Sequence, residues 1–420
     1  MIQTAATVRR TYYVLTAGNT LAASLIWGIN TIFLLDAGLS NFEAFAANAF
    51  FTAGMMLFEI PTGIVADSRG RRISFLAGTI TLAVTTALYV LLWQLGSPFV
   101  WWAIVSALLG LGFTFFSGAV EAWLVDALTA TGFSGDLEAV FGRGQIVSGE
   151  AMLGGSVAGG YIAQVTSLGV PFVLRAAVLA IMFVVAFRLM RDIGFTPERG
   201  KGAVSEMRQI ASASIDYGWR VPAVKWIMVS SIPLGGIGIY VFYALQPYLL
   251  ELVGDPDAYG IAGLVAAIVA GAQIAGGVAA PWIRRLFRRR TTALLMSTIV
   301  GTLTLALMGL IENFWVVLGL VVVWALLFAA ERPIRQTYLN GLIPSRQRAT
   351  ILSFDSMLSS GGGVVAQPAL GRAADVWGYG TSYVLSAGIS AFALPYIVLS
   401  RRQNDRADVA DGMYAMQGAE

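Results

Sequence analysis

The chain has 420 residues, of which 57% are hydrophobic and 12% are charged, and its formal net charge is +3. The charged share is about half that of an ordinary soluble domain, so most of the chain is expected to lie in lipid. The sequence contains no cysteine and no histidine, which excludes disulfides, thiolate chemistry, the usual zinc sites and a histidine general base.

A membrane-spanning helix needs about 20 mostly apolar residues. The first half of the chain holds six such runs, at residues 11–35, 44–66, 73–95, 99–125, 144–169 and 172–187. The second half holds six more, at residues 226–250, 258–283, 291–311, 314–339, 349–374 and 376–400, the last beginning after a turn at Gly378 and Gly380. The first run is too long for a cleavable signal peptide. The predicted fold class is an all-α membrane protein with twelve transmembrane helices.

Lysine and arginine fall on alternate connections between these runs. The connections after the first, third, fifth, seventh and ninth runs hold neither residue. Basic residues occupy the other side: Arg9, Arg10, Arg69, Arg71, Arg72, Arg143, residues 188–225, residues 284–290, Arg346, Arg348, Arg401, Arg402 and Arg406. Positive charge marks the cytoplasmic side. We therefore expect a multi-pass protein of the cell membrane, in a bacterial inner membrane, with both termini cytoplasmic.

The longest connection, residues 192–222, contains Pro197, Gly200 and mixed charges and is interpreted as a linker. It divides the chain into a six-helix bundle at 1–191, a second bundle at 223–400 and a cytoplasmic tail at 401–420. Its stretch "VSEMRQIASASIDYGW" is a candidate amphipathic surface helix. A shift of 212 to 214 residues aligns several features of the two halves, which indicates parallel six-helix repeats of the kind found in transporters.

The connection between the second and third runs carries a motif. It reads Gly63-x-x-Ala66-Asp67-x-x-Gly70-Arg71-Arg72, and it resembles the signature loop of the major facilitator superfamily. The resemblance implies two pseudo-symmetric bundles and a gating latch in which Asp67 and the loop arginines meet Asp126 at the end of the fourth helix. Glycines permit tight turns and close helix approach. The alternative, that the arginines only mark the cytoplasmic side, leaves Asp67 unexplained.

A second resemblance concerns the fifth run, which contains "GSVAGG" at residues 155–160. It is similar to a glycine pattern of drug-proton antiporters, with Ser156 where they have proline. The resemblance favours export, and Gly155, Gly159 and Gly160 predict close helix packing. Any glycine-rich membrane helix is the alternative interpretation. The chain also departs from the antiporters at Ser106, where they carry an arginine.

Charged residues inside membrane runs are costly, so each is a candidate for function. A carboxylate can carry a proton through a transport cycle only where poor hydration favours its protonated form. Glu121, on the fourth helix, is the predicted proton carrier, assisted by Glu59 or Glu150. For Arg175 and Asp355 we expect structural pairing.

In the resembled fold the first, fourth, seventh and tenth helices line a central cavity. The substrate-cavity candidates are Trp27, Asn30, Phe113, Phe116, Trp123, Tyr240, Tyr243, Gln246, Glu331, Arg332 and Arg335. An aromatic, mostly apolar cavity suits bulky amphipathic ligands. The alternative for Glu331 is a structural ion pair with Arg335, four residues further along the same helix.

The leading hypothesis is a secondary active transporter that exports small amphipathic or lipophilic compounds by alternating access, driven by the proton gradient. One alternative is uptake or facilitated diffusion of a small anionic metabolite bound by Arg332 and Arg335. Another is a membrane sensor or scaffold that transports nothing. The sequence has no GxxxxGK[ST] loop, so ATP drive is not expected. We expect no enzyme activity, cofactor, metal or nucleic-acid partner; the expected partners of this monomer are a small-molecule substrate, membrane lipid and protons.

Overall fold

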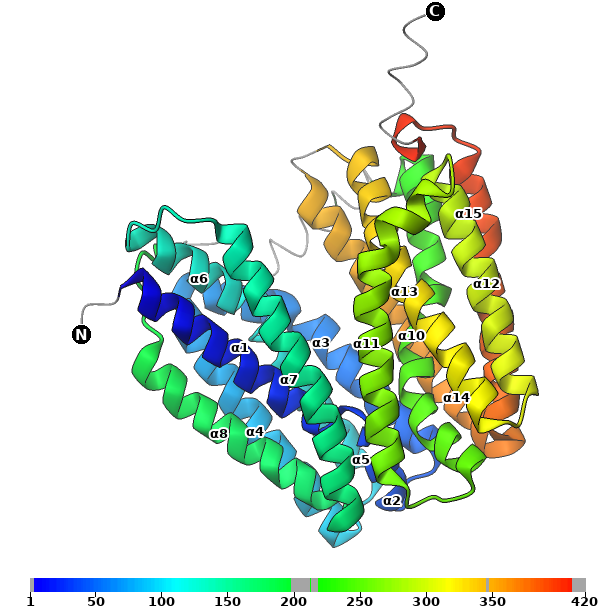
Figure 1. Cartoon of the computed structure of the whole chain (residues 1–420), viewed down its shortest axis with the longest axis horizontal. Coiled ribbons are helices and arrows are strands. Elements are labelled where there is room, and N and C mark those ends of the chain that lie inside the picture. Colours follow the sequence, from blue (N-terminus) through cyan, green and yellow to red (C-terminus); the bar gives the residue numbers. More distant parts are fainter. Residues whose placement is uncertain (1–3, 198–211, 213–217, 345–346, 410–420) are drawn as a thin grey trace, which may run out of the picture. The chain divides into compact units, whose positions relative to one another are not determined.

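The computed structural model of the protein describes residues 4–197, 212, 218–344 and 347–409. Helices account for nearly all of these residues, and the only β-type pairing among them is an isolated bridge between Arg289 and Val409. Figure 1 shows the helices in chain order. The predicted all-α fold is confirmed.

The six predicted runs of the first half correspond to helices α1 to α8. These are α1 (Ala5–Trp27), α2 (Asn30–Asp36), α3 (Asn41–Arg69), α4 (Arg71–Leu95), α5 (Phe99–Thr114), α6 (Ala119–Ala130), α7 (Leu137–Val165) and α8 (Gly169–Leu189). Two of the six runs are broken. The first bends by 46° between α1 and α2, and the fourth divides at Gly118, whose φ of +65° is unfavourable for a residue with a side chain.

The second half forms α10 (Pro222–Val253), α11 (Tyr259–Arg285), α12 (Arg290–Leu310), α13 (Phe314–Leu342), α14 (Arg348–Ala391) and α15 (Ala393–Arg401). α14 is not one continuous helix, because Gly378 interrupts it with φ +80° and ψ 166°. The predicted turn between the last two spans lies at this glycine.

Nine helices in the described ranges are long and apolar enough to span a membrane, or ten if the bent α1–α2 pair is one span. One of the nine, Thr350–Arg401, contains both of the last two predicted spans, separated at Gly378. α7 is not among the nine; it carries Glu150 and many glycines. With that division and α7 included, the helices account for the twelve predicted spans.

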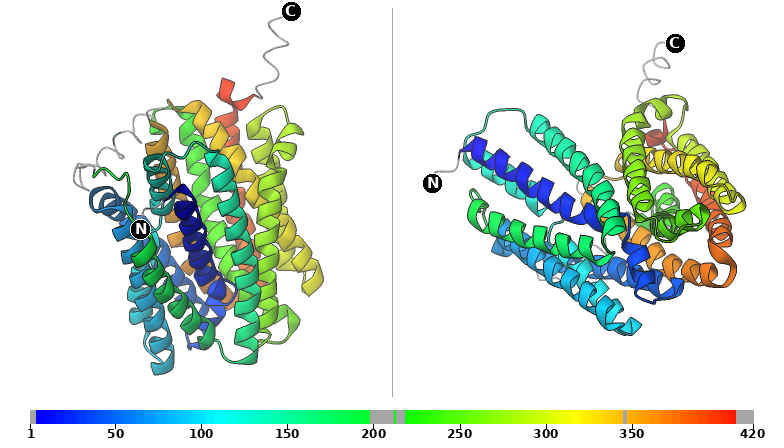
Figure 2. Two further views of the ribbon diagram at one scale, coloured as in Figure 1. Left: turned by 60° about the vertical axis from the view of Figure 1, so that its left-hand side comes forward. Right: turned by 60° about the horizontal axis from the view of Figure 1, so that its bottom comes forward.

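The chain forms two compact units. Unit 1 contains α1 to α8 and the start of α11 up to Ala270, and unit 2 contains α10, the rest of α11 and α12 to α15. Figure 2 shows the helices within each unit from two further sides. Most of the predicted linker at 192–222, with its candidate amphipathic helix, lies outside the described residues, as does most of the tail. The predicted domain bounds therefore stay predictions.

Within unit 1, α1 and α7 lie side by side (Figures 1 and 2). A Cβ atom added at Gly159 would lie 1.9 Å from the carbonyl oxygen of Leu25, and one added at Gly155 would lie 1.9 Å from the hydroxyl of Ser24. A Cβ added at Gly160 would lie 2.6 Å from the carbonyl oxygen of Tyr259 and 2.7 Å from Cα of Gly263, on α11 in the same unit. These glycines have a packing role, since no side chain fits there without moving backbone or neighbours.

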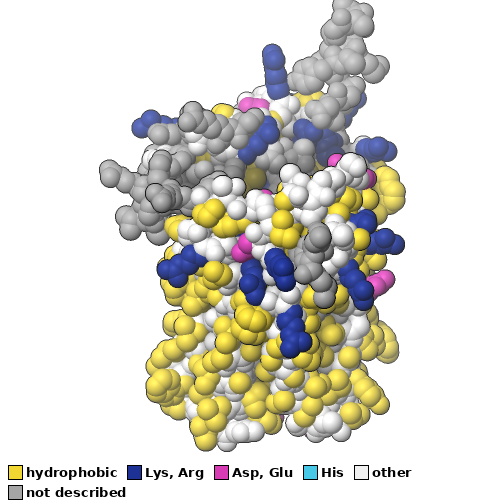
Figure 3. Space-filling view, turned by 90° about the vertical axis from the view of Figure 1, so that its left-hand side faces the viewer, with side chains coloured by type: hydrophobic (Ala, Val, Ile, Leu, Met, Phe, Trp, Pro, Cys, Tyr) yellow, Lys and Arg dark blue, Asp and Glu magenta, His cyan; other side chains and the backbone are white. Residues whose placement is uncertain are grey.

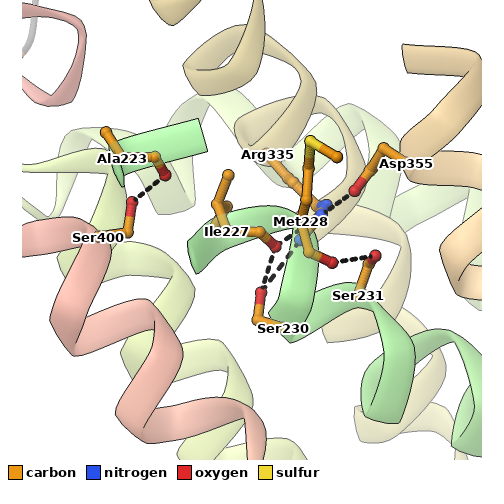
Figure 4. Close-up of polar contacts among 8 residues, drawn as sticks. All are labelled: Ala223, Ile227, Met228, Ser230, Ser231, Arg335, Asp355 and Ser400. Carbon is orange, nitrogen blue, oxygen red and sulfur yellow. Dashed lines mark hydrogen bonds and ion pairs between the residues drawn. The ribbon is translucent and has the colours of Figure 1, made fainter. Parts of the chain in front are cut away.

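In unit 2, buried apolar side chains of α10, α12 and α13 form a core around Met228 and Tyr338. Polar bonds join its elements: the hydroxyls of Tyr338 and Ser400 lie 3.0 Å apart, and Ser400 donates to the carbonyl of Ala223 at 2.8 Å (Figure 4). α10, α13 and α15 are thereby joined at one end of the unit.

Each half of the chain also uses a carboxylate that follows its sixth predicted span to bind the start of the helix that forms its third span. In unit 2 the Asp408 carboxylate, only 1% exposed, accepts hydrogen bonds from the backbone N–H of Thr291 at 2.7 Å and from its hydroxyl at 2.8 Å. In unit 1 Asp192 accepts from the backbone N–H of Arg72 at 2.9 Å. Helix N-termini offer unpaired N–H groups and a positive dipole end, so both contacts stabilise the helix start.

The face in Figure 3 has two distinct ends: Lys and Arg side chains gather towards one, and hydrophobic side chains cover the other.

Since the chain has no native cysteine, the predicted topology is testable with single cysteines. Ser97→Cys and Asp255→Cys should react with a membrane-impermeant maleimide in intact cells. Arg288→Cys, just before α12 begins at Arg290, should react only after permeabilisation. Labelling of Arg288→Cys in intact cells would overturn the predicted orientation.

Candidate functional site

The signature loop forms the junction of α3 and α4 in unit 1. Asp67 and Arg71 form an ion pair there. Gly70 has φ +109°, and an added Cβ would lie 2.2 Å from a carboxylate oxygen of Asp192, so this position needs glycine. Gly63 lies inside α3, and an added Cβ there would meet nothing within 4 Å among the described residues.

The predicted third member of the latch, Asp126, makes no ion pair within the described ranges. The segment after α8 lies beside it instead. The carbonyl of Arg191 accepts from the indole of Trp123 at 2.7 Å, and Gly194 packs on the backbone of Asp126. Asp192 in this segment binds the start of α4, and burial raises the pKa of its carboxyl, opposed by the hydrogen bond and charge of Arg72. Sequence analysis missed Asp192, which is one of several acidic residues in a polar connection.

We expect Asp67→Asn to weaken transport while leaving folding intact. Asp67 is 49% exposed, and exposed ion pairs contribute only about 0–1 kcal/mol to stability. Transport into proteoliposomes and thermal unfolding of the purified variant measure the two effects. Ser68→Ala, an exposed neutral change on the same turn, is the control. Equal transport by Asp67→Asn and the wild type would contradict a gating role.

The three predicted proton carriers of unit 1 have exposed side chains in the structure: Glu59, Glu121 and Glu150. Glu59 accepts a hydrogen bond from the Ser117 hydroxyl at 2.6 Å. The assignment of the proton to these residues stays a prediction. Arg175 is 3% exposed, with its guanidinium 5.6 Å from the centre of the Phe113 ring.

Unit 2 contains a cavity of about 400 Å³ between α10, α12, α13 and α14. This volume lies within the usual range for small-molecule sites. Four charged residues line it: Glu331, Arg332, Arg335 and Asp355. The structure thus brings together the three charged residues predicted for the substrate site, and it adds Asp355, for which only structural pairing was predicted.

Asp355 and Arg335 form a largely buried ion pair, with Nη2 of the guanidinium 2.5 Å from Oδ1 of the carboxylate. The same guanidinium donates to the carbonyl of Ile227 at 2.9 Å and to the hydroxyl of Ser230 at 3.3 Å (Figure 4). The pairing expected for Asp355 is present. Arg335 is therefore held by α10 and α14, and its positive charge is already neutralised.

Glu331 lies one turn before Arg335 on α13. Within the part of the chain that the structure describes, no cation lies at ion-pair distance from its carboxylate. The alternative interpretation, a Glu331–Arg335 clamp, is not present, because Asp355 on α14 takes the arginine. Arg332 is exposed and also lines the cavity. Among the residues that the structure describes, neither the Glu331 carboxylate nor the Arg332 guanidinium of this cavity has an ion-pair partner.

The rest of the lining combines aromatic rings and hydroxyls. Trp324 and Phe328 stack with ring centres 5.1 Å apart on one face of α13. The lining also includes Ser231 on α10 and Thr298 and Thr302 on α12. Sequence analysis missed these residues, because serine and threonine are common in membrane helices and carry no signal of their own.

The other cavity candidates do not line this space. Trp123 and Tyr240 are fully buried. Each is hydrogen-bonded inside its own unit, Trp123 to Arg191 and Tyr240 to Ser382 at 2.6 Å. Both therefore occupy packing positions. Gln246 and Phe116 are buried as well, whereas Trp27, Asn30, Phe113 and Tyr243 are half-buried.

The sequence profile of the Major Facilitator Superfamily matches residues 12–366 and, in a second match, residues 234–412. These matches cover well over half of the chain, which therefore belongs to this superfamily. The protein is a membrane transporter of the major facilitator type. No curated protein sequence matches the chain.

Solved structures share the fold at low identity. The nucleoside transporter NupG has a TM-score of 0.76 at 11% identity, over 94% of this chain and 99% of that chain. A bacterial homologue of the human lysosomal transporter Spinster, inward-facing and unoccupied, has a TM-score of 0.72 at 14% identity, over 98% and 100%. A POT family transporter in complex with 5-aminolevulinic acid has a TM-score of 0.70 at 13% identity, over 94% and 96%. At these identities the likeness establishes the fold alone.

Proposed function

We propose that this transporter exports small amphipathic compounds and that the proton gradient drives it. The observation that carries the proposal is the lining of the unit 2 cavity. The Trp324–Phe328 stack offers an apolar surface, and Glu331 with Arg332 offers unpaired charge of both signs. A compound with a ring system and a polar or charged end matches both surfaces.

The export direction rests on the similarity of residues 155–160 to the antiporter pattern. Proton coupling rests on carboxylates within membrane helices, which are costly to place there and are therefore candidates for function. Glu121, with Glu59 or Glu150, is the sequence-based candidate for the carrier. Gating is assigned to the signature loop, with Asp67, Arg71, Arg72 and Asp126 as the proposed latch.

The alternative of an anionic substrate bound by Arg332 and Arg335 has less support. Arg335 is engaged by Asp355, and the two acidic and two basic residues of the lining leave it without net charge. An anion therefore meets one available guanidinium beside an unpaired carboxylate, which repels it.

A ligand screen by thermal shift, followed by flux measurements in proteoliposomes, tests the proposal. The panel contains a lipophilic cation, a zwitterionic amphipath, a nucleoside and 5-aminolevulinic acid, since specific binding stabilises the folded state. Export by exchange for protons predicts that the binding compound accumulates when the lumen is acidic. Accumulation only with an alkaline lumen would indicate uptake together with protons. Binding without flux would support the sensor alternative.

A further inference from the structure

One wall of the unit 2 cavity comes from α12, which was not expected at a substrate site. The sequence placed the first, fourth, seventh and tenth helices at the cavity, and α12 is the ninth of the twelve predicted spans. The α12 residues in the lining are Ser297, Thr298, Gly301, Thr302 and Leu305. The cavity therefore extends, within unit 2, to a helix outside the expected set.

The apolar part of the cavity contains a ring pair on α13. Trp324 is 6% exposed and stacks on Phe328, with ring centres 5.1 Å apart and ring planes 19° apart. Phe328 is the less buried of the two, and both residues belong to the lining. An aromatic ligand can add to such a pair, because aromatic rings attract one another beyond the apolar area that they bury.

Gly238 on α10 provides the space that the Phe328 ring occupies. A Cβ atom added at Gly238 would lie 2.6 Å from Cε2 and 2.8 Å from Cζ of that ring. These atoms are the far end of a movable side chain. At Gly236 on the same helix the nearest atom is instead the carbonyl oxygen of Gly362, at 2.7 Å. Gly238→Ala should therefore displace the ring and change the cavity at little cost in stability.

Gly301 on α12 leaves space in a different way. It belongs to the cavity lining, and an added Cβ there would meet nothing within 4 Å among the described residues. A methyl group at this position would fill space without displacing a neighbour. Glycine thus leaves room at two points of the lining: at Gly238 for a ring of the protein, and at Gly301 for a ligand.

Charged groups lie close to the ring pair along α13. Glu331 follows Phe328 by three residues, so the two side chains share a face of the helix and lie about 4.5 Å apart along its axis. Glu331 and the next residue, Arg332, both line the cavity. A ligand with its ring on Phe328 therefore needs only a short arm to bring a polar end to these charges.

We propose that Phe328 and α12 line an aromatic-ring subsite in unit 2, and that Gly238 and Gly301 set the size of the ring system that it accepts. This inference rests on the proposed transport of amphipathic compounds and names their class, an aromatic ring system with a polar end on a short arm. One methyl group in a filled apolar pocket changes binding by about 10- to 200-fold. A side chain at either glycine should therefore exclude large ring systems first.

The test measures ligand affinity by thermal shift of the purified full chain, since binding stabilises the folded state. Two probe series carry one, two or three fused rings: phenylalanine, naphthylalanine and anthrylalanine, and the corresponding arylmethylamines. Gly238→Ala and Gly301→Ala should each weaken binding of the largest probe that the wild type binds by about 10-fold or more, and of the one-ring probe by less than about 3-fold. The control is Gly361→Ala, where an added Cβ also meets nothing within 4 Å but which lies outside the lining; it should bind all probes like the wild type.

A double variant tests whether Gly238 acts through the ring. Phe328→Leu alone should weaken binding of every probe by about 2- to 10-fold, because it removes the aromatic contact. It also removes the ring that a side chain at position 238 displaces. Adding Gly238→Ala to Phe328→Leu should therefore lower the affinity for the largest probe by less than about 3-fold further, a departure from additivity that identifies the two residues as coupled.

Equal loss of affinity for every ring size in Gly238→Ala and Gly301→Ala, or no loss in either, overturns the inference. So does the same loss in Gly361→Ala, or a wild type that no probe stabilises. If Gly238→Ala does not fold, Gly301→Ala decides the size limit. Proteoliposome flux tests the proposed function separately. If the probes bind with the expected size dependence and a proton gradient does not drive their export, the proposed function fails and the ring subsite stands.

Discussion

Replacing Asp355 by alanine should destabilise the protein by about 3–5 kcal/mol, the usual cost of leaving one partner of a buried ion pair without the other. The side chains of Arg335 and Asp355 are only 12% and 15% exposed. The remaining acceptors of Arg335, on Ile227 and Ser230, carry no charge. Thermal unfolding of the purified variant in detergent measures the effect.

Two comparisons separate loss of the charge pair from general damage. The double variant Arg335→Leu/Asp355→Leu should recover most of the stability, because it removes both buried charges. Asp67→Ala, at the half-exposed pair with Arg71, should cost less than about 1 kcal/mol. If Asp355→Ala destabilised the protein no more than Asp67→Ala, water in the cavity would be solvating Arg335, and the ion pair would not be a stabilising contact.

The membrane runs were predictable because lipid imposes a length and an apolar composition on every crossing. The breaks inside them were not. The bend between α1 and α2 and the left-handed backbone at Gly118 lie within apolar runs. A hydropathy profile records the composition of a run and says nothing about the conformation of its backbone. Gly378 was predictable as a turn because it stands between two runs that together are too long for one crossing.

The charged residues of the site were predictable one by one, but their partners were not. Charge inside a membrane run identifies Glu331, Arg332 and Arg335 as candidates. Sequence spacing offers only the local partner, Glu331 with Arg335. The structure shows that Arg335 pairs with Asp355, on a different helix, and that choice depends on how α13 and α14 pack. Thr298 and Thr302 belong to the cavity lining only through the way α12 packs in unit 2, which spacing along the chain does not report.

α1 packs closely on α7, and α10 packs closely on α14. At each of these contacts one glycine is crowded and a nearby glycine is open, so we expect opposite effects on stability when each is replaced by alanine. In unit 2 a Cβ added at Gly362 would lie 2.0 Å from the carbonyl oxygen of Ile232, whereas one added at Gly361 would meet nothing within 4 Å. Unit 1 offers a matching pair on α7, in which Gly159 is blocked by Leu25 and Gly154 is open. The blocking atoms belong to backbone, so they cannot move without shifting a helix.

We expect Gly159→Ala and Gly362→Ala each to destabilise the protein by about 1–3 kcal/mol or more, the range for overpacking. Gly154→Ala and Gly361→Ala should be neutral or should stabilise it by up to about 1 kcal/mol, because alanine restricts the unfolded chain and favours helix. The sign of the change therefore differs within each pair, while the chemical change is the same. Thermal unfolding of the four variants decides the matter. Destabilisation of equal size within a pair would mean that helix flexibility, and not contact between helices, sets the need for glycine at these positions.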